Sequence, residues 1–117
     1  MKKTVVIKKN YEFKKMFSKG KFFYGEYVHF YIVENKLNYN KFGIAISRKQ
    51  GKAVDRNHIK RLIRENYKII EEKIKVGYSF LITINKNKKI EEISYYNIKE
   101  DFERIFKKAG ILLWESY

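Results

Sequence analysis

Apolar residues that recur at helical spacing predict three helices along the chain. The first is short and runs from Asn10 to Met16 or Phe17, with Asn10 as its N-cap. Phe13 and Phe17 stand four residues apart and therefore share one face of this helix. Gly20, of the residue type that most often ends helices, closes it.

The second predicted helix is the longest and runs from Arg56 to Lys75. Its apolar stripe follows the 3.6-residue helical period and consists of Ile59, Leu62, Ile63, Ile69, Ile70 and Ile74. Asp55 is its N-cap or first-turn acid, and Gly77 ends it. The third helix covers residues 97–109. Its buried stripe consists of Ile98, Phe102, Ile105, Phe106 and Ala109.

Strands are predicted where aromatic and β-branched residues alternate. Residues 22–33 have the pattern of one long strand, residues 42–47 of a second and residues 78–84 of a third. Alternation places two sets of residues of the first strand on opposite sides: Val28, Phe30 and Ile32 on one, and Tyr27, His29, Tyr31 and Val33 on the other. In the second strand one side carries only small residues, which leave room for another element or a ligand: Gly43, Ala45 and Ser47. These elements predict the α+β class, as a single-domain αβ sandwich with a small central sheet over residues 1–117.

Composition identifies the charge of the partner. The 117 residues are 44% hydrophobic and 17% aromatic, enough to bury a core, while 27 Lys+Arg against 13 Asp+Glu give a net charge of +14. Such an excess attracts polyanions, of which nucleic acid is the commonest; a membrane surface and a merely solvating charged exterior are the alternatives. The absence of cysteine excludes disulfides and thiolate metal sites. No apolar run approaches the roughly 20 residues of a membrane span, and the N-terminal apolar stretch is too short for a signal peptide, so a cytoplasmic protein is expected.

The longest helix concentrates its cations on one side. On a helical wheel a broad arc opposite the apolar stripe holds Arg56, Asn57, Lys60, Arg61, Arg64 and Lys68. A solvated helix face of mixed charge, the ordinary alternative, would have acids four residues from these bases, but the first such acid within the arc is Glu71. The segment before the helix adds Arg48, Lys49 and Lys52. Gly51 there is expected to permit a sharp turn, and free N–H groups at the helix start suit a phosphate.

The same region carries a long motif. Residues 42–47 form a strand that ends in Ser47 and is followed by two basic residues. The chain then continues as Gly51-x-Ala53-Val54-x-Arg56-Asn57-x-x-Lys60-Arg61-x-x-Arg64-Glu65. This run closely resembles the signature of the bacterial ribonuclease P protein subunit. Three further features match the family: the paired Phe13 and Phe17 followed by Gly20, the aromatic Tyr31, and the order of elements along the whole chain.

The resemblance implies a subunit of a ribonucleoprotein that removes the 5′ leader of precursor tRNA. It implies that catalysis belongs to the RNA, which uses Mg²⁺. It also implies that one protein binds one ribonuclease P RNA to form the holoenzyme, and that a membrane is not a partner. It also implies a left-handed βαβ crossover, against the usual right-handed preference. The positions that would face RNA are Arg48, Lys49, Lys52, Arg56, Asn57, Lys60, Arg61, Arg64 and Lys68. Those that would hold the precursor-tRNA leader are Phe13, Phe17, Tyr31, Lys60 and Arg64.

The sequence departs from the family pattern in two places. His58 stands where a third base is usual after Arg-Asn, and the helical wheel places it near the apolar edge, where a packing or weak polar role is expected rather than catalysis. The third strand ends in Ile84-Asn85 where the family has Ala-Arg, so Lys86 or Lys88 is a candidate to replace the missing cation.

Three other functions compete with this interpretation. A protein-only nuclease would need clustered carboxylates or an acid–base set; Asp55, His58 and Glu65 lie near one another in sequence, but Asp55 and Glu65 do not converge on the helical wheel. A non-enzymatic RNA-binding module remains possible and would be indifferent to the leader. A membrane-surface helix would favour Trp or Phe on its apolar face, whereas this one is aliphatic.

Overall fold

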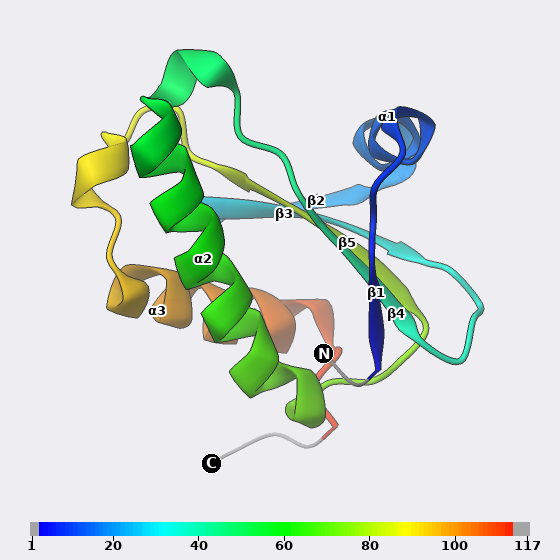
Figure 1. The fold of residues 1–117 in the computed structure, drawn as a ribbon. Helices are drawn as coiled ribbons and strands as arrows, with labels where there is room; N and C mark the ends of the chain where they lie inside the picture. Colours follow the sequence, from blue (N-terminus) through cyan, green and yellow to red (C-terminus); the bar gives the residue numbers. More distant parts are fainter. Residues whose placement is uncertain (1–2, 114–117) are drawn as a thin grey trace.

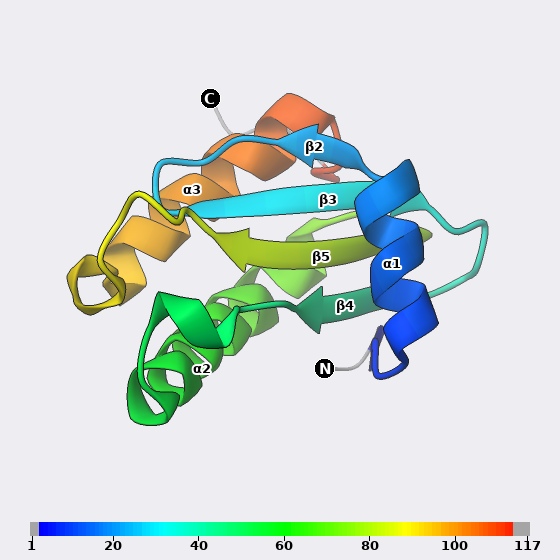
Figure 2. The same ribbon diagram turned by 90° about the horizontal axis from the view of Figure 1, so that it is seen from above.

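A mixed five-stranded sheet with helices on both faces organises the computed structural model, which describes residues 3–113 (Figures 1 and 2). The strands are β1 (Thr4–Val6), β2 (Lys21–Phe23), β3 (Val28–Glu34), β4 (Asn40–Ile44) and β5 (Tyr78–Ile84), in the order β1-β4-β5-β3-β2. The helices are α1 (Asn10–Lys19), α2 (Ala53–Ile70) and α3 (Tyr95–Ala109). Short 3-10 helices are η1 (Arg48–Gln50), η2 (Glu71–Lys73) and η3 (Ile90–Glu92). The predicted α+β class is confirmed.

The two faces of the sheet carry different helices. The large alternating residues of the strands pack with α2 and α3 in the main core, where Phe30 lies 4.9 Å from Phe102 and Phe42 lies 4.2 Å from Tyr67, ring centroid to centroid. Figure 1 shows α1 on the opposite side of the sheet. There the small side of β4 lets α1 approach, because a Cβ on Gly43 would lie 3.1 Å from Phe13. Another element of the chain therefore occupies the space beside Gly43.

The connection from β4 through α2 to β5 has the left-handed sense that the resemblance implied. β4 and β5 are adjacent and parallel. In Figure 2 both point left, β5 lies above β4, and α2 passes behind the sheet while α1 lies in front. This arrangement defines a left-handed crossover, which is rare among βαβ units.

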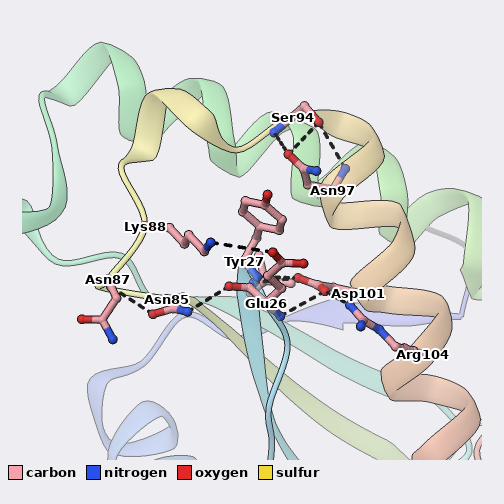
Figure 3. Close-up of polar contacts among 10 residues, drawn as sticks. Glu26, Tyr27, Asn85, Asn87, Lys88, Ser94, Asn97, Asp101 and Arg104 are labelled. Atoms are coloured by element: carbon pink, nitrogen blue, oxygen red, sulfur yellow. Dashed lines mark hydrogen bonds and ion pairs between the residues drawn. The ribbon is translucent and has the colours of Figure 1, made fainter.

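The prediction of one long strand from Phe22 to Val33 is wrong. β2 and β3 are separate antiparallel strands, with Phe22 opposite Tyr31. The turn between them is held by Asp101 of α3, whose buried carboxylate accepts hydrogen bonds from the backbone N–H groups of residues 26, 27 and 28 at 2.7–3.1 Å (Figure 3). Because these N–H groups bond to a side chain, they are unavailable to continue a strand.

The other strand predictions fare unevenly. β5 has the predicted bounds, Tyr78–Ile84. β4 is shifted towards the N-terminus relative to the predicted 42–47, since it runs from Asn40 to Ile44. β1 was not predicted; it pairs in parallel with β4 at the sheet edge.

Helix ends also differ from the predictions. Lys9, not Asn10, is the N-cap of α1, while Gly20 is its C-cap as predicted. α2 begins at Ala53, with Asp55 in its first turn as predicted, and ends at Ile70 rather than Lys75. α3 begins two residues early at Tyr95, because Ser94 and Asn97 form a reciprocal capping box.

The apolar stripe of α2 needs one correction. Ile59, Ile63 and Ile70 are buried as predicted, but Ile69 is 54% exposed. Tyr67 takes its place in the core, together with Asn66, whose amide donates to the carbonyls of residues 62 and 95. The stripe of α3 is buried as predicted, with Ala109 at its edge.

Candidate nucleic-acid interface

The polar arc of α2 faces outward and is free of acid partners. Four of its members are exposed: Asn57, Arg61, Arg64 and Lys68. Two are half-buried: Arg56 and Lys60. Ion pairs among residues 3–113 are those of Glu12, Glu26 and Asp101, none of which involves a cation of α2. From Arg56 to Lys68 the arc extends about 18 Å along the helix, at about 1.5 Å per residue. Its positive charge is therefore available to an external anion.

Glu71, the acid expected within this arc, is absent from it. Its side chain is buried and accepts hydrogen bonds from the hydroxyl of Thr4 and from the backbone N–H of Lys3. The Tyr67 hydroxyl lies 2.8 Å from the same Thr4 hydroxyl, and burial raises the pKa of Tyr67 to about 12. The acid thus ties the N-terminal strand to α2 and leaves the cationic side unneutralised.

Arg56 has a structural contact that the sequence did not suggest. Its Nη1 donates to the carbonyl of Gly51 at 2.6 Å, which fastens the segment before the helix to the first turn of α2. The chain bends at Gly51 as predicted, between η1 and α2, although the residue itself has an extended backbone at φ 166° and ψ 174°. Glycine is needed there for close approach, since a Cβ would lie 2.9 Å from the buried side chain of Ile90.

The segment before α2 presents the remaining cations. Ser47 and Gln50 cap η1 reciprocally: Lys49 N–H donates to the Ser47 hydroxyl, and Ser47 N–H donates to Gln50 Oε1 at 2.9 Å. Arg48 and Lys49 are exposed on this rigid turn. Lys52 is the N-cap of α2 and makes no side-chain capping bond. The N–H groups of the first turn of α2 therefore lie beside a cation cluster, where a phosphate is favoured.

A groove of about 510 Å³ lies between α1 and α2 on the face of the sheet that carries α1. Figure 2 shows these two helices on either side of the segment that leaves β4. The lining residues are Phe13, Phe17, Ile44, Ala45, Ile46, Ser47, Gln50, Lys60 and Thr83. The rings of Phe13 and Phe17 thus share one open groove with the half-buried Lys60, which lies more than 40 positions later in the chain.

Three of the five residues predicted to hold the leader line this groove: Phe13, Phe17 and Lys60. Tyr31 lies at its edge, with its ring 5.0 Å from that of Phe17. Arg64 is exposed one turn along α2 from Lys60 and does not line it. Ser47 was noted from the sequence as a small residue that leaves room for a ligand, whereas Gln50 and Thr83 were not singled out, because only the folded sheet brings them to the groove.

The end of β5, where the sequence departs from the family pattern, is connected to the start of β3 (Figure 3). Asn85 is buried and connects β5 to the start of β3, donating from Nδ2 to the carbonyl of Glu26 at 2.9 Å. Lys88 is held 3.7 Å from the Glu26 carboxylate and 5.1 Å from the ring centroid of Tyr27. Lys86 is exposed. Of the two candidate replacement cations, Lys86 is therefore the one available to an outside partner.

His58 is exposed and does not pack at the apolar edge, and its contact with Arg61 agrees with the weak polar role that was the other expectation for it. Its Nδ1 lies 3.1 Å from Nη2 of Arg61, one turn along the cationic side of α2. Among residues 3–113 no three His, Asp or Glu side chains gather closely enough to hold a metal ion. In the same part of the chain no helix is both long and apolar enough to cross a membrane.

A small mixed sheet, a cationic helix and an adjoining aromatic groove define a small basic αβ protein of the kind that binds RNA. Comparison with known proteins gives the same class and narrows it. The chain belongs to the ribonuclease P protein family, whose family model, "Ribonuclease P", matches residues 1–110.

Relatives and solved structures cover nearly the whole chain. The ribonuclease P protein component of Thermoanaerobacter sp. is 36% identical over 94% of this chain and 93% of its own. That of Fusobacterium nucleatum is 38% identical over 91% and 97%. The Staphylococcus aureus RNase P protein structure superposes with a TM-score of 0.78 at 30% identity, over 91% of this chain and 95% of that one. The Thermotoga maritima RNase P protein gives a TM-score of 0.79 at 25% identity, over 89% and 96%.

Proposed function

We propose that this protein, as the protein component of ribonuclease P, divides RNA binding between two adjoining surfaces. The outer side of α2 and the turn before it bind the ribonuclease P RNA. The groove between α1 and α2 binds the 5′ leader of precursor tRNA. Residues 1–117 act as one domain in a holoenzyme of one protein and one RNA, in which the RNA carries out catalysis with Mg²⁺.

The observation that carries this proposal is the convergence of Phe13, Phe17 and Lys60 on one groove. Unpaired bases stack on aromatic rings with little sequence preference, while nearby cations follow the phosphates. A leader is single-stranded and differs from one tRNA to the next, so a tolerant surface of this kind suits it. Tyr31 extends the aromatic lining through its contact with Phe17.

The cationic surface has the properties expected for binding a structured RNA through its backbone. Its exposed residues are Arg48, Lys49, Lys52, Asn57, Arg61, Arg64 and Lys68. Arg56 contributes by fixing the preceding segment through Gly51, in addition to its own charge. Contacts to phosphate position an RNA without reading its sequence. The base-stacking groove and the phosphate-binding helix are therefore complementary parts of one interface.

The test is reconstitution with a bacterial ribonuclease P RNA that supports cleavage with the wild-type protein. We expect the protein to raise the affinity of the holoenzyme for precursor over mature tRNA. Phe17→Ala should lower the affinity for the precursor about 5-fold or more, which corresponds to about 1 kcal/mol for one lost stacking contact. Tyr11→Ala is the matched control, because Tyr11 is an exposed aromatic residue of the same helix outside the groove.

Equal affinities of the wild-type holoenzyme for precursor and mature tRNA would contradict leader binding. That result would favour a general RNA-binding module that stabilises the RNA subunit alone.

A further inference from the structure

Five rings form a continuous row on the sheet face that carries α1. Phe17 lies 5.0 Å from Tyr31, and Tyr31 lies 5.0 Å from Phe22, measured between ring centroids. Phe22 lies 5.9 Å from Tyr24 and 5.2 Å from His29. The Tyr24 and His29 rings are 4.4 Å apart. This aromatic row begins at the edge of the groove and continues beyond it over β2 and the turn that follows.

The far end of the aromatic row is open to solvent. Tyr24 is 68% exposed and Phe22 is 43% exposed, while His29 is half-buried between them. β2 is the edge strand of the sheet that residues 3–113 form, and within that range no further strand pairs beyond it (Figure 2). Neighbouring exposed aromatic rings on a folded domain are typical of a surface that another molecule covers.

The aromatic row and the groove are parts of one surface. Thr83 lines the groove, and it lies directly opposite His29 in the antiparallel pairing of β3 with β5. Side chains of directly opposed residues project from the same face of a sheet about 5 Å apart. A chain that leaves the groove across Thr83 therefore reaches His29 first and then the exposed rings of Tyr24 and Phe22.

Charge identifies the kind of molecule that fits. Residues 10–33 carry four exposed lysines: Lys14, Lys15, Lys19 and Lys21. The same stretch has two acids, and both are paired, Glu12 with Lys41 at 3.1 Å and Glu26 with Lys88 at 3.7 Å. Exposed rings next to a helix, α1, that carries exposed lysines suit unpaired bases joined by phosphates.

His29 fits this surface as an uncharged ring. Burial lowers its pKa below the ordinary value of 6.5, against the opposing effect of Asp101. The backbone N–H of Gly25 donates to His29 Nδ1 at 3.2 Å, which places the proton of the neutral ring on Nε2. The His29 ring is thereby held beside that of Tyr24, at an interplanar angle of 37°, and its Nε2–H remains as a donor.

We propose that Phe22, Tyr24 and His29 form a second stacking surface, which binds the unpaired nucleotides of the leader that extend beyond the groove. This inference rests on the proposed binding of the leader in the groove. It assigns the distal leader to the β2 edge of the sheet, and it makes affinity depend on leader length.

The test compares precursor tRNAs whose leaders increase one nucleotide at a time, bound by the reconstituted holoenzyme. With the wild-type protein we expect affinity to rise again after the groove is filled. Tyr24→Ala combined with Phe22→Ser should remove this second rise. The double variant should bind precursors with the longest leaders about 5-fold or more weakly than wild type, and its affinity should differ least with the shortest leaders. Tyr24→Phe should retain it, because stacking needs the ring and not the hydroxyl. Tyr96→Ala is the control, since Tyr96 is equally exposed but lies on α3.

Two outcomes would overturn the inference while leaving the proposed function in place. One is a normal preference for precursor over mature tRNA, sensitive to Phe17→Ala, with no effect of the double variant at any leader length. The other is a wild-type dimer in sedimentation that the double variant converts to monomer without altering leader affinity, which would give this surface to a second copy of the chain. Absence of any precursor preference in the wild type would instead refute the proposed function. Circular dichroism of each variant separates loss of binding from loss of fold.

Discussion

Lys60 and Arg64 stand one turn apart on α2 but have different surroundings. Lys60 is half-buried in the groove, whereas Arg64 is exposed on the outer side of the helix. Both side chains lie away from the core formed by Ile59 and Ile63. Each is therefore available to a phosphate, Lys60 beside the leader and Arg64 beside the RNA surface.

This arrangement predicts a salt-dependent effect. Lys60→Ala and Arg64→Ala should each weaken holoenzyme assembly or precursor binding and lower the slope of log K against log salt concentration by about 0.7–0.9 per lost phosphate contact. Their unfolding free energies should stay within about 0.5 kcal/mol of wild type, as for other surface substitutions. Binding isotherms at several salt concentrations measure the slope, with Lys108→Ala on the exposed side of α3 as control. An unfolded Arg64→Ala protein would mean that Arg64 supports the fold and does not serve an external phosphate.

At the scale of elements, one buried carboxylate determines where β2 ends and β3 begins. Asp101 accepts three backbone hydrogen bonds from the turn and one from Nη2 of Arg104 at 2.6 Å. Gly25 is required in this turn, because a Cβ there would collide with the Val28 carbonyl and lie 3.0 Å from the Asp101 carboxyl carbon. The hairpin that carries the aromatic row is thus fastened to α3 on the opposite side of the sheet.

Removing this carboxylate should destabilise the fold. Asp101→Ala removes the acceptor of three backbone N–H groups, of which that of Val28 is buried and the other two are partly buried, so we expect the free energy of unfolding to fall by about 3 kcal/mol. Arg104→Ala should cost about 1 kcal/mol at most, because the arginine side chain is 64% exposed. Urea denaturation of both variants measures the difference. Similar losses for the two would show that the ion pair, and not the backbone hydrogen bonds, stabilises the turn.

The strands and helices show what sequence patterns can and cannot predict. β5 was predicted residue for residue, because its alternation is local and a glycine precedes it at Gly77. The break between β2 and β3 was missed, since it depends on Asp101, more than 70 residues away. α2 was predicted too long because Ile74 continues its apolar stripe. The chain between Ile70 and Ile74 is instead the 3-10 helix η2, in which Glu71 bonds to the N-terminal strand.

The candidate site also has a part that the sequence predicted and a part that it did not. The cationic side of α2 was predictable, because a helix places residues of fixed spacing on one face. The role proposed for Phe13 and Phe17 came from family resemblance, since spacing alone equally suits core packing. Thr83, Phe22 and Tyr24 escaped notice because their relation to the groove arises from strand pairing between β2, β3 and β5.

At the scale of the whole molecule, charge determines the division of labour with RNA. The net charge is +14, and several acids are engaged within the fold: Glu12, Glu26, Glu71 and Asp101. A positive surface repels divalent cations and attracts phosphates. The protein is therefore suited to neutralising a folded RNA, a task that Mg²⁺ otherwise performs by screening.

The corresponding prediction concerns the Mg²⁺ requirement of cleavage. The protein alone should leave a 5′-labelled precursor tRNA intact at millimolar Mg²⁺, while adding it to the ribonuclease P RNA should lower the Mg²⁺ concentration for half-maximal cleavage. A Mg²⁺ titration of RNA alone, protein alone and the two together measures both effects. A variant that combines Arg61→Ala with Arg64→Ala should need more Mg²⁺ than wild type, because fewer phosphates are neutralised, whereas Lys107→Ala with Lys108→Ala removes the same charge from α3 and should not.

These variants separate local from global charge. If both double variants raise the Mg²⁺ requirement equally, net charge alone matters and the cationic side of α2 has no special position against the RNA. If only the α2 variant does so, the effect depends on where the cations lie, which is what their one-sided and unpaired arrangement predicts. Cleavage by the protein without RNA at the same Mg²⁺ concentration would contradict the assignment of catalysis to the RNA, whichever variant was used.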